Sequence, residues 1–236
     1  LTPGVTFGGA RDAYGRWFHE AQDVVSRWHH GYMEYELSHV ASYFPEKEIS
    51  LQVCPLQKHD GYLVHYNIIA DSEIVFCAVL GGMTDYIGRF DPLESKVREL
   101  TLADCQDAAA AISGNYATIT HTTSGDRICC GCNFDAQVLT DAAEAALEAT
   151  PTLAAVPHTG LPQVVKFIKH LAPGQRMEGD LVVLYNSDEA TLQYYLAADR
   201  RSEIVADISK KHANIKMQTP DLRLNATVID QQIALD

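Results

Sequence analysis

Aromatic and aliphatic residues recur at steps of three and four along residues 11–44. They are Tyr14, Trp17, Phe18, Ala21, Val24, Val25, Trp28, Tyr32 and Tyr35. This spacing is typical of one stripe of an amphipathic helix. Pro45 ends the pattern, because the residue before a proline is disfavoured in the helical conformation. The sequence therefore predicts a long aromatic amphipathic helix over residues 11–44.

Alternation of apolar and polar positions predicts several strands farther along. In residues 48–54, Ile49, Leu51 and Val53 alternate with polar side chains, which is the two-residue period of a half-buried strand. Three later pairs of segments are rich in β-branched and aromatic residues, and each pair flanks a short polar turn. The pairs are residues 62–69 with 74–80, residues 116–122 with 127–134, and residues 181–185 with 191–197. Each pair is predicted to form a hairpin.

A helix-forming segment is predicted after each hairpin. These segments are residues 101–112, 136–149 and 202–215, with an extra helix over residues 162–171 and a final alternating strand over residues 222–228. Each hairpin exposes an apolar face that the following helix can cover. The order thus predicts an α+β fold, with a mainly antiparallel sheet built from three hairpin-plus-helix units after the long aromatic helix.

The domain organisation leaves two alternatives open. A chain of 236 residues, 47% of them hydrophobic, is long enough to bury a large core as a single domain over residues 1–236 or as two tightly packed halves. Three prolines and Gly160 fall within residues 151–162. Proline and glycine clusters are typical of connections, so any boundary is expected there.

Charge and cysteine content narrow the class of protein. With 31 acidic and 18 basic residues the formal net charge is −13, which repels phosphate backbones and anionic lipid, so neither nucleic acid nor a membrane is expected as a partner. The longest apolar run, residues 74–80, is too short to cross a bilayer. Six cysteines in this length are far fewer than disulfide-dependent secreted domains carry. We therefore expect six free thiols and a cytoplasmic location, with a secreted or processed form as the alternative.

The strongest candidate for chemistry is a Cys-Cys-Gly-Cys run on the second arm of the middle hairpin. Cys130 and Cys132 are expected on one strand face, where they offer two thiolates to a metal, and His121 lies across the hairpin as an imidazole partner. A structural zinc site needs four ligands, and no second metal-binding motif is found in the sequence. The predicted role of these thiols is packing in a sheet core, with no metal or cofactor.

The sequence carries no motif that names a reaction. It therefore predicts a binding or assembly protein that acts through protein or ligand contacts. One alternative is a small-molecule enzyme using a Cys/His site on the 121–132 hairpin, and another is a subunit of a large particle. The final strand and the wide aromatic face present more apolar surface than a lone monomer is expected to bury. A homo-oligomer or a protein partner is therefore expected, with a small molecule as a further possible ligand.

Overall fold

The computed structural model describes residues 2–7, 14–29, 31–40, 49–81, 90–91, 96–97, 108–122, 124–142 and 162–212. Strands dominate these residues, and every strand pairing is antiparallel. One sheet contains, in spatial order, β10 (Ala108–Ser113), β11 (Tyr116–His121), β12 (Arg127–Cys132), β15 (Arg176–Tyr185), β6 (Gly61–Ile69), β5 (Ile49–Pro55), β4 (Tyr32–Ser38) and β3 (Asp23–His29). A second sheet contains β13 (Gln137–Ala142), β14 (Gln163–Leu171), β7 (Ile74–Gly81), β1 (Thr2–Phe7) and β2 (Tyr14–Trp17). A separate ribbon joins β8 (Phe90–Asp91) to β9 (Lys96–Val97).

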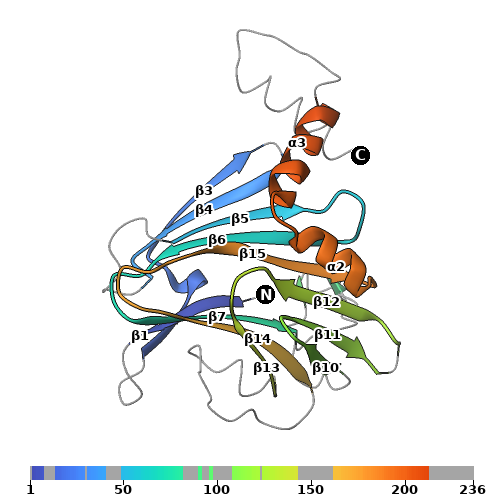
Figure 1. Ribbon diagram of the computed structural model, residues 1–236, viewed down its shortest axis with the longest axis horizontal. Coiled ribbons are helices and arrows are strands. Elements are labelled where there is room, and N and C mark those ends of the chain that lie inside the picture. Colours follow the sequence, from blue (N-terminus) through green and yellow to red (C-terminus); the bar gives the residue numbers. More distant parts are fainter. Residues whose placement is uncertain are drawn as a thin grey trace.

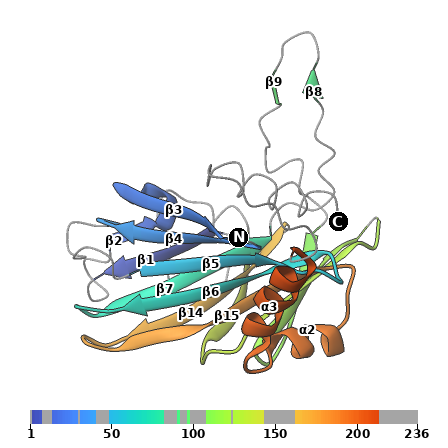
Figure 2. The ribbon, with the colours of Figure 1, turned by 90° about the horizontal axis from the view of Figure 1, so that it is seen from above.

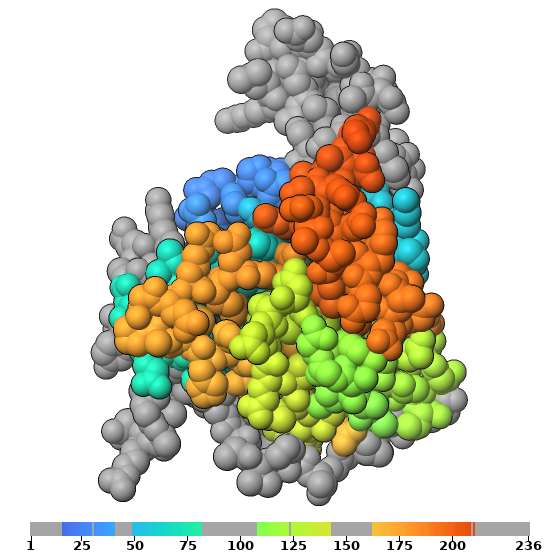
Figure 3. All heavy atoms as spheres, viewed as in Figure 1, coloured from blue at the N-terminus to red at the C-terminus, as the bar shows by residue number. Residues whose placement is uncertain are grey.

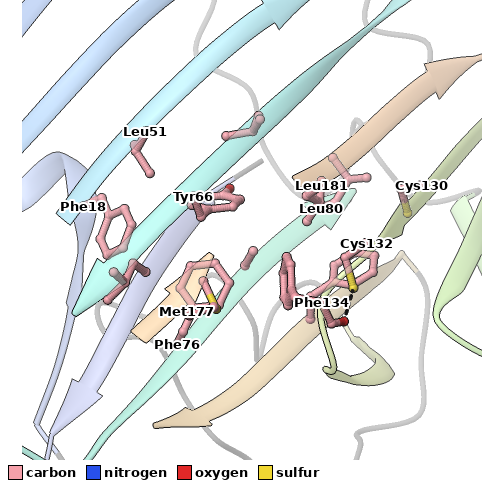
Figure 4. Packing of buried hydrophobic residues seen from close by; sticks show 14 of the residues in the cluster. Phe18, Leu51, Tyr66, Phe76, Leu80, Cys130, Cys132, Phe134, Met177 and Leu181 are labelled. Carbon is pink, nitrogen blue, oxygen red and sulfur yellow. Dashed lines mark hydrogen bonds between the residues drawn. The ribbon is translucent and has the colours of Figure 1, made fainter. Parts of the chain in front are cut away.

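The eight-stranded and five-stranded sheets stack face to face as a β-sandwich (Figures 1 and 2). Because successive side chains of a strand point to opposite faces, each strand contributes alternate residues to the space between the sheets. Tyr66 of β6 and Leu181 of β15 meet Phe76 and Leu80 of β7 in this core (Figure 4). The inner faces of the two sheets thus supply the largest hydrophobic cluster of the described residues.

Two short helices cover the outer face of the eight-stranded sheet. They are α2 (Glu189–Leu196), which packs on β12 and β15, and α3 (Arg200–His212), which lies toward β5; Figure 3 shows both helices on this face. Leu192 and Ile208 are fully buried against outward-facing residues such as Leu63 and Leu184. Neither helix within the described part of the chain is long and apolar enough to span a membrane.

The predicted α+β fold is wrong, because most segments expected to be helical are strands. The described residues of 101–112 and 136–149 form β10 and β13, and residues 162–171 form β14. In β14 both faces are buried, including Val164, Val165 and Phe167. A short apolar run buried on both faces does not show the alternation that distinguishes a strand from a buried helix.

The long aromatic helix is also wrong. The described part of residues 11–44 contains β2, a single 3₁₀ turn called η1 (Phe18–Glu20), β3 and β4. β3 and β4 form a hairpin in which His29 pairs with Tyr32, and Gly31 in the turn has a φ of +94°. A Cβ atom at Gly31 would lie 2.3 Å from the Ile208 side chain of α3, so both the turn and the close helix require glycine there.

The first predicted hairpin has the right strands and the wrong pairing. Residues 62–69 and 74–80 lie in β6 and β7, yet β6 pairs with β5 and β15, whereas β7 pairs with β1 and β14. The turn between them therefore connects the two sheets instead of joining neighbouring strands. The third predicted hairpin is wrong because residues 189–196 are helical, with the Asp188 side chain accepting a hydrogen bond from the Thr191 N–H at 2.8 Å.

Several predictions are confirmed. The strand over residues 48–54 corresponds to β5, the hairpin of residues 116–122 and 127–134 corresponds to β11 and β12, and the helix over residues 202–215 corresponds to α3. The strand predicted over residues 222–228 lies outside the described residues, as does the proposed boundary at 151–162 except for Pro162. Strands on either side of that boundary, β13 and β14, pair with each other. Whether the chain is one domain or two halves stays a prediction.

Candidate ligand-binding cleft

A cleft of about 430 Å³ lies between η1 and the inner face of strands β3–β6. Buried aliphatic side chains form its base, among them Leu37 of β4, Leu51 of β5 and Val64 of β6. Phe18 of η1 is also buried, and Figure 4 shows it beside Leu51 at this end of the core. The rim is exposed and includes His19. The cleft is therefore an apolar cavity with an open mouth.

Strand alternation explains why the walls are apolar. In β4, Tyr35 and Leu37 face the cleft, while Glu34 and Glu36 point to the opposite face and form ion pairs with Arg27. Because successive side chains of β4 point to opposite faces, one face supplies the aromatic and aliphatic lining of the cleft and the other supplies a charged outer surface.

Three tyrosines bring polar atoms to this apolar lining: Tyr35, Tyr62 and Tyr66. Tyr35 and Tyr62 are partly exposed, whereas Tyr66 is fully buried. Burial raises the pKa of Tyr62, and the nearby Cys130 thiol raises it further. The hydroxyl groups of Tyr62 and Tyr66 are therefore neutral hydrogen-bonding groups over the physiological pH range.

Tyr66 has the most unusual environment of the three. Its hydroxyl has no hydrogen-bond partner among the described residues, although the side chain is 0% exposed. Burial raises the pKa of this phenol well above its ordinary value, and Tyr62 raises it further. An unpaired buried hydroxyl costs about 1–3 kcal/mol relative to a hydrogen-bonded one. The lining of the cleft thus includes a phenol whose buried hydroxyl lacks a hydrogen-bond partner among the described residues.

A polar row crosses the outer face of the same sheet. Glu34 accepts hydrogen bonds from Gln52 Nε2 at 3.1 Å and is 3.1 Å from His29 Nε2. Farther along, His65 Nδ1 lies 2.8 Å from Asp180 Oδ1, and Asn133 Nδ2 donates to the other Asp180 oxygen at 3.0 Å. These groups satisfy one another, and no group of three or more metal-ligating side chains occurs among the described residues. We interpret the row as a structural network.

The structure places the predicted cysteine candidates in the core. Cys130 and Cys132 share the inner face of β12 and are 0% exposed, whereas Cys129 faces α2 on the outer side. The Cys132 thiol donates to the Phe134 carbonyl at a sulfur–oxygen distance of 3.4 Å (Figure 4). Burial raises the pKa of Cys132 to about 12, so it carries almost no thiolate at neutral pH. The five described cysteines are free thiols, and Cys105 lies outside the described residues.

His121 is not close to these thiols. Cys130 pairs with Ala117, and His121 lies four residues farther along β11, which corresponds to about 13 Å at the rise of a strand. The His121 Nδ1 atom instead accepts a hydrogen bond from the Ser124 N–H at 3.0 Å within the β11–β12 turn. The structure therefore does not bring His121, Cys130 and Cys132 together as one site.

The cleft residues were missed at the level of sequence. By sequence pattern alone, Tyr35 lies on the stripe of the predicted helix, and Tyr62 and Tyr66 lie in a predicted strand. The alternation of Tyr62, Val64 and Tyr66 does indicate a shared face. Nothing in that alternation shows that the face meets η1 and leaves a cavity.

No protein-family model and no curated protein matches the chain. Among solved structures, it is similar to a putative kojibiose phosphorylase from the human microbiome, with a TM-score of 0.40 and 7% identity over 88% of this chain and 26% of that one. It is also similar to a polysaccharide lyase, with a TM-score of 0.39 and 9% identity over 83% of this chain and 27% of that one. The chain spans about a quarter of the length of each of these two structures.

Proposed function

We propose that the protein is a binding protein whose cleft holds a compact, neutral, mainly apolar molecule with one hydrogen-bonding group. The single observation that supports this is the buried Tyr66 hydroxyl without a partner among the described residues, in a cleft otherwise lined mostly by aromatic and aliphatic groups. A ligand group that bonds to this hydroxyl removes an energetic cost that the empty protein carries.

The shape and charge of the cleft support this class of ligand. Its volume of about 430 Å³ lies within the usual range for small-molecule pockets, which are mainly apolar with a few polar groups that orient the ligand. The described residues of its lining include no Asp, Glu, Lys or Arg. Burying a charged ligand there would leave the charge without a counter-ion, so a neutral molecule is favoured.

The geometry favours binding over the Cys/His enzyme alternative. A cysteine nucleophile needs an adjacent base and a lowered pKa. Cys130 instead has a raised pKa, chiefly because it is buried, and His121 lies beyond hydrogen-bonding reach of it.

A pair of matched probes tests the proposal. We expect 2-naphthol to bind more tightly than naphthalene, by about 3- to 10-fold, because one hydrogen bond contributes about 0.5–1.5 kcal/mol. Titration monitored by probe fluorescence measures both affinities. Tyr66→Phe should remove the difference between the probes, and Tyr35→Phe, at a partly exposed wall position, should retain it. Failure of both probes to bind, or an unchanged preference in Tyr66→Phe, contradicts the proposal.

A further inference from the structure

Strand β3 is the terminal strand of the eight-stranded sheet (Figure 1). Six of its seven residues are exposed, and only His29 is partly buried. Three large apolar side chains are exposed on it, with Val24 at 49%, Val25 at 45% and Trp28 at 48%. An exposed edge presents backbone N–H and C=O groups that another strand can pair with, and exposed apolar side chains strengthen such pairing.

The sequence of β3 is complementary to itself in the antiparallel direction. With a two-fold axis through Ser26, Val24 lies opposite Trp28 of the second copy, and Val25 lies opposite its Arg27. Asp23 then lies opposite His29 of the second copy, which places an acidic group beside an imidazole. All seven residues pair in this register, and no like charges lie opposite each other. A shift by two residues in either direction shortens the pairing to five residues, and in one direction it places Arg27 against Arg27.

We propose that β3 is the interface of a two-fold symmetric homodimer, in which the two β3 strands pair and join the eight-stranded sheets of both copies into one continuous sheet. Antiparallel self-pairing makes the contact isologous, so the same patch serves both copies and the assembly closes at two subunits. The pairing of Val24 with Trp28 provides apolar complementarity despite the net charge of −13 on each copy, and Asp23 faces a His29 whose Nε2 also contacts Glu34 of its own chain.

The pairing also relates the interface to the cleft. Val24 lines the cleft and pairs with Leu37 of β4. In the dimer, Trp28 of the second copy lies across from Val24 on the same face of the joined sheet. Each copy would thereby extend the apolar surface at the rim of the other copy's cleft.

Substitution at Val25 tests the interface directly, because this side chain is exposed and lies on the face opposite the cleft. Val25→Lys places a lysine against Arg27 of the second copy at two symmetric positions, and we expect the dissociation constant to rise about tenfold. Within its own chain Val25 pairs with Glu36, so a lysine there does not harm the fold. Val25→Thr keeps a β-branched side chain of similar size without adding a charge and should retain the dimer.

Sedimentation velocity of the whole chain over a concentration series gives the readout. We expect a dimer for the unsubstituted protein and for Ile112→Lys, which introduces the same charge at an exposed position on β10, the opposite edge strand of the same sheet. Thermal unfolding verifies that each variant is folded. A monomer at all concentrations overturns the proposal, as does a dimer that Val25→Lys and Ile112→Lys affect equally. Because none of these variants changes a cleft residue, the dimer and the ligand proposal can fail independently.

Discussion

The rings of Tyr66 and Phe76 pack edge to face, with centroids 5.0 Å apart and ring planes at 62° (Figure 4). Tyr66 belongs to β6 of the eight-stranded sheet and Phe76 to β7 of the five-stranded sheet. Phe76 also contacts Phe18 and Phe134, with ring centroids 6.2 and 6.1 Å away. This aromatic cluster connects the two layers and holds the Tyr66 ring in its place in the cleft.

Phe76→Ala should therefore destabilise the protein strongly. Loss of a fully buried phenylalanine leaves a cavity and typically lowers the free energy of unfolding by about 3–5 kcal/mol. Guanidinium denaturation followed by circular dichroism measures the change. Ile69→Ala, at a side chain that is 40% exposed, serves as the control and should change the free energy by less than about 1 kcal/mol. A similar effect of both substitutions would show that the inter-sheet core is not the main source of stability.

Tyr66→Phe should stabilise the ligand-free protein. The substitution removes a buried hydroxyl without a partner among the described residues and keeps the ring that packs on Phe76. We expect the free energy of unfolding to rise by about 1 kcal/mol, because the desolvation cost of the hydroxyl disappears. Thermal unfolding of Tyr66→Phe and of the control Tyr35→Phe gives the comparison. A destabilised Tyr66→Phe would mean that the hydroxyl is hydrogen-bonded in solution.

Alkaline pH should destabilise the protein through its buried thiols. Burial raises the pKa of Cys54 and of Cys77 to about 11, from an ordinary value of 9. Above pH 9 the unfolded thiol loses its proton while the folded one keeps it, so the unfolded state binds fewer protons and stability falls as pH rises toward 11. The contribution is at most about 3 kcal/mol for each thiol.

Urea denaturation at pH 7.5 and pH 10 measures this loss. Cys54→Ala should show a smaller decrease between the two pH values than the unsubstituted protein, because one of the shifted groups is absent. Equal decreases in both proteins would show that Cys54 does not contribute to the pH dependence.

Substituting only one partner of the ion pair between Lys166 and Asp141 should destabilise the protein. Each of the two side chains is only 3% exposed. The pair joins β14 to β13 on the outer face of the five-stranded sheet. Asp141→Asn removes the Asp141 carboxylate from beside the buried lysine charge and should lower the free energy of unfolding by about 3–5 kcal/mol.

The double variant Asp141→Leu with Lys166→Met tests whether that cost comes from the uncompensated charge. Replacing both ions with apolar groups of similar size is often close to neutral, so we expect most of the stability to return. Chemical denaturation of the single and double variants provides the measurement. A double variant as unstable as Asp141→Asn would indicate that the pair itself, rather than the isolated charge, stabilises the fold.

Local patterns in the sequence determined many of the strands. The alternation in residues 48–54 and the β-branched residues of 62–69, 74–80, 116–122 and 127–134 lie mainly in strands in the structure. They also determined that Cys130 and Cys132 face one side of β12 and Cys129 the other, because the side-chain period of a strand is two residues. These properties depend only on neighbouring residues, so they can be read without knowledge of the fold.

Only the tertiary structure decided which strands pair and where the cleft forms. The aromatic residues of 23–38 satisfy a helical spacing as well as a strand, and they become β3 and β4 because β4 pairs with β5 in the large sheet. Likewise, β6 and β7 are adjacent in sequence but belong to different sheets. There β6 pairs with β15 and β7 pairs with β14, and no local pattern identifies these distant partners. The cavity beside Tyr66 exists because η1 returns from the second sheet to pack near β6, and apolar spacing along the chain carries no information about such a long-range approach.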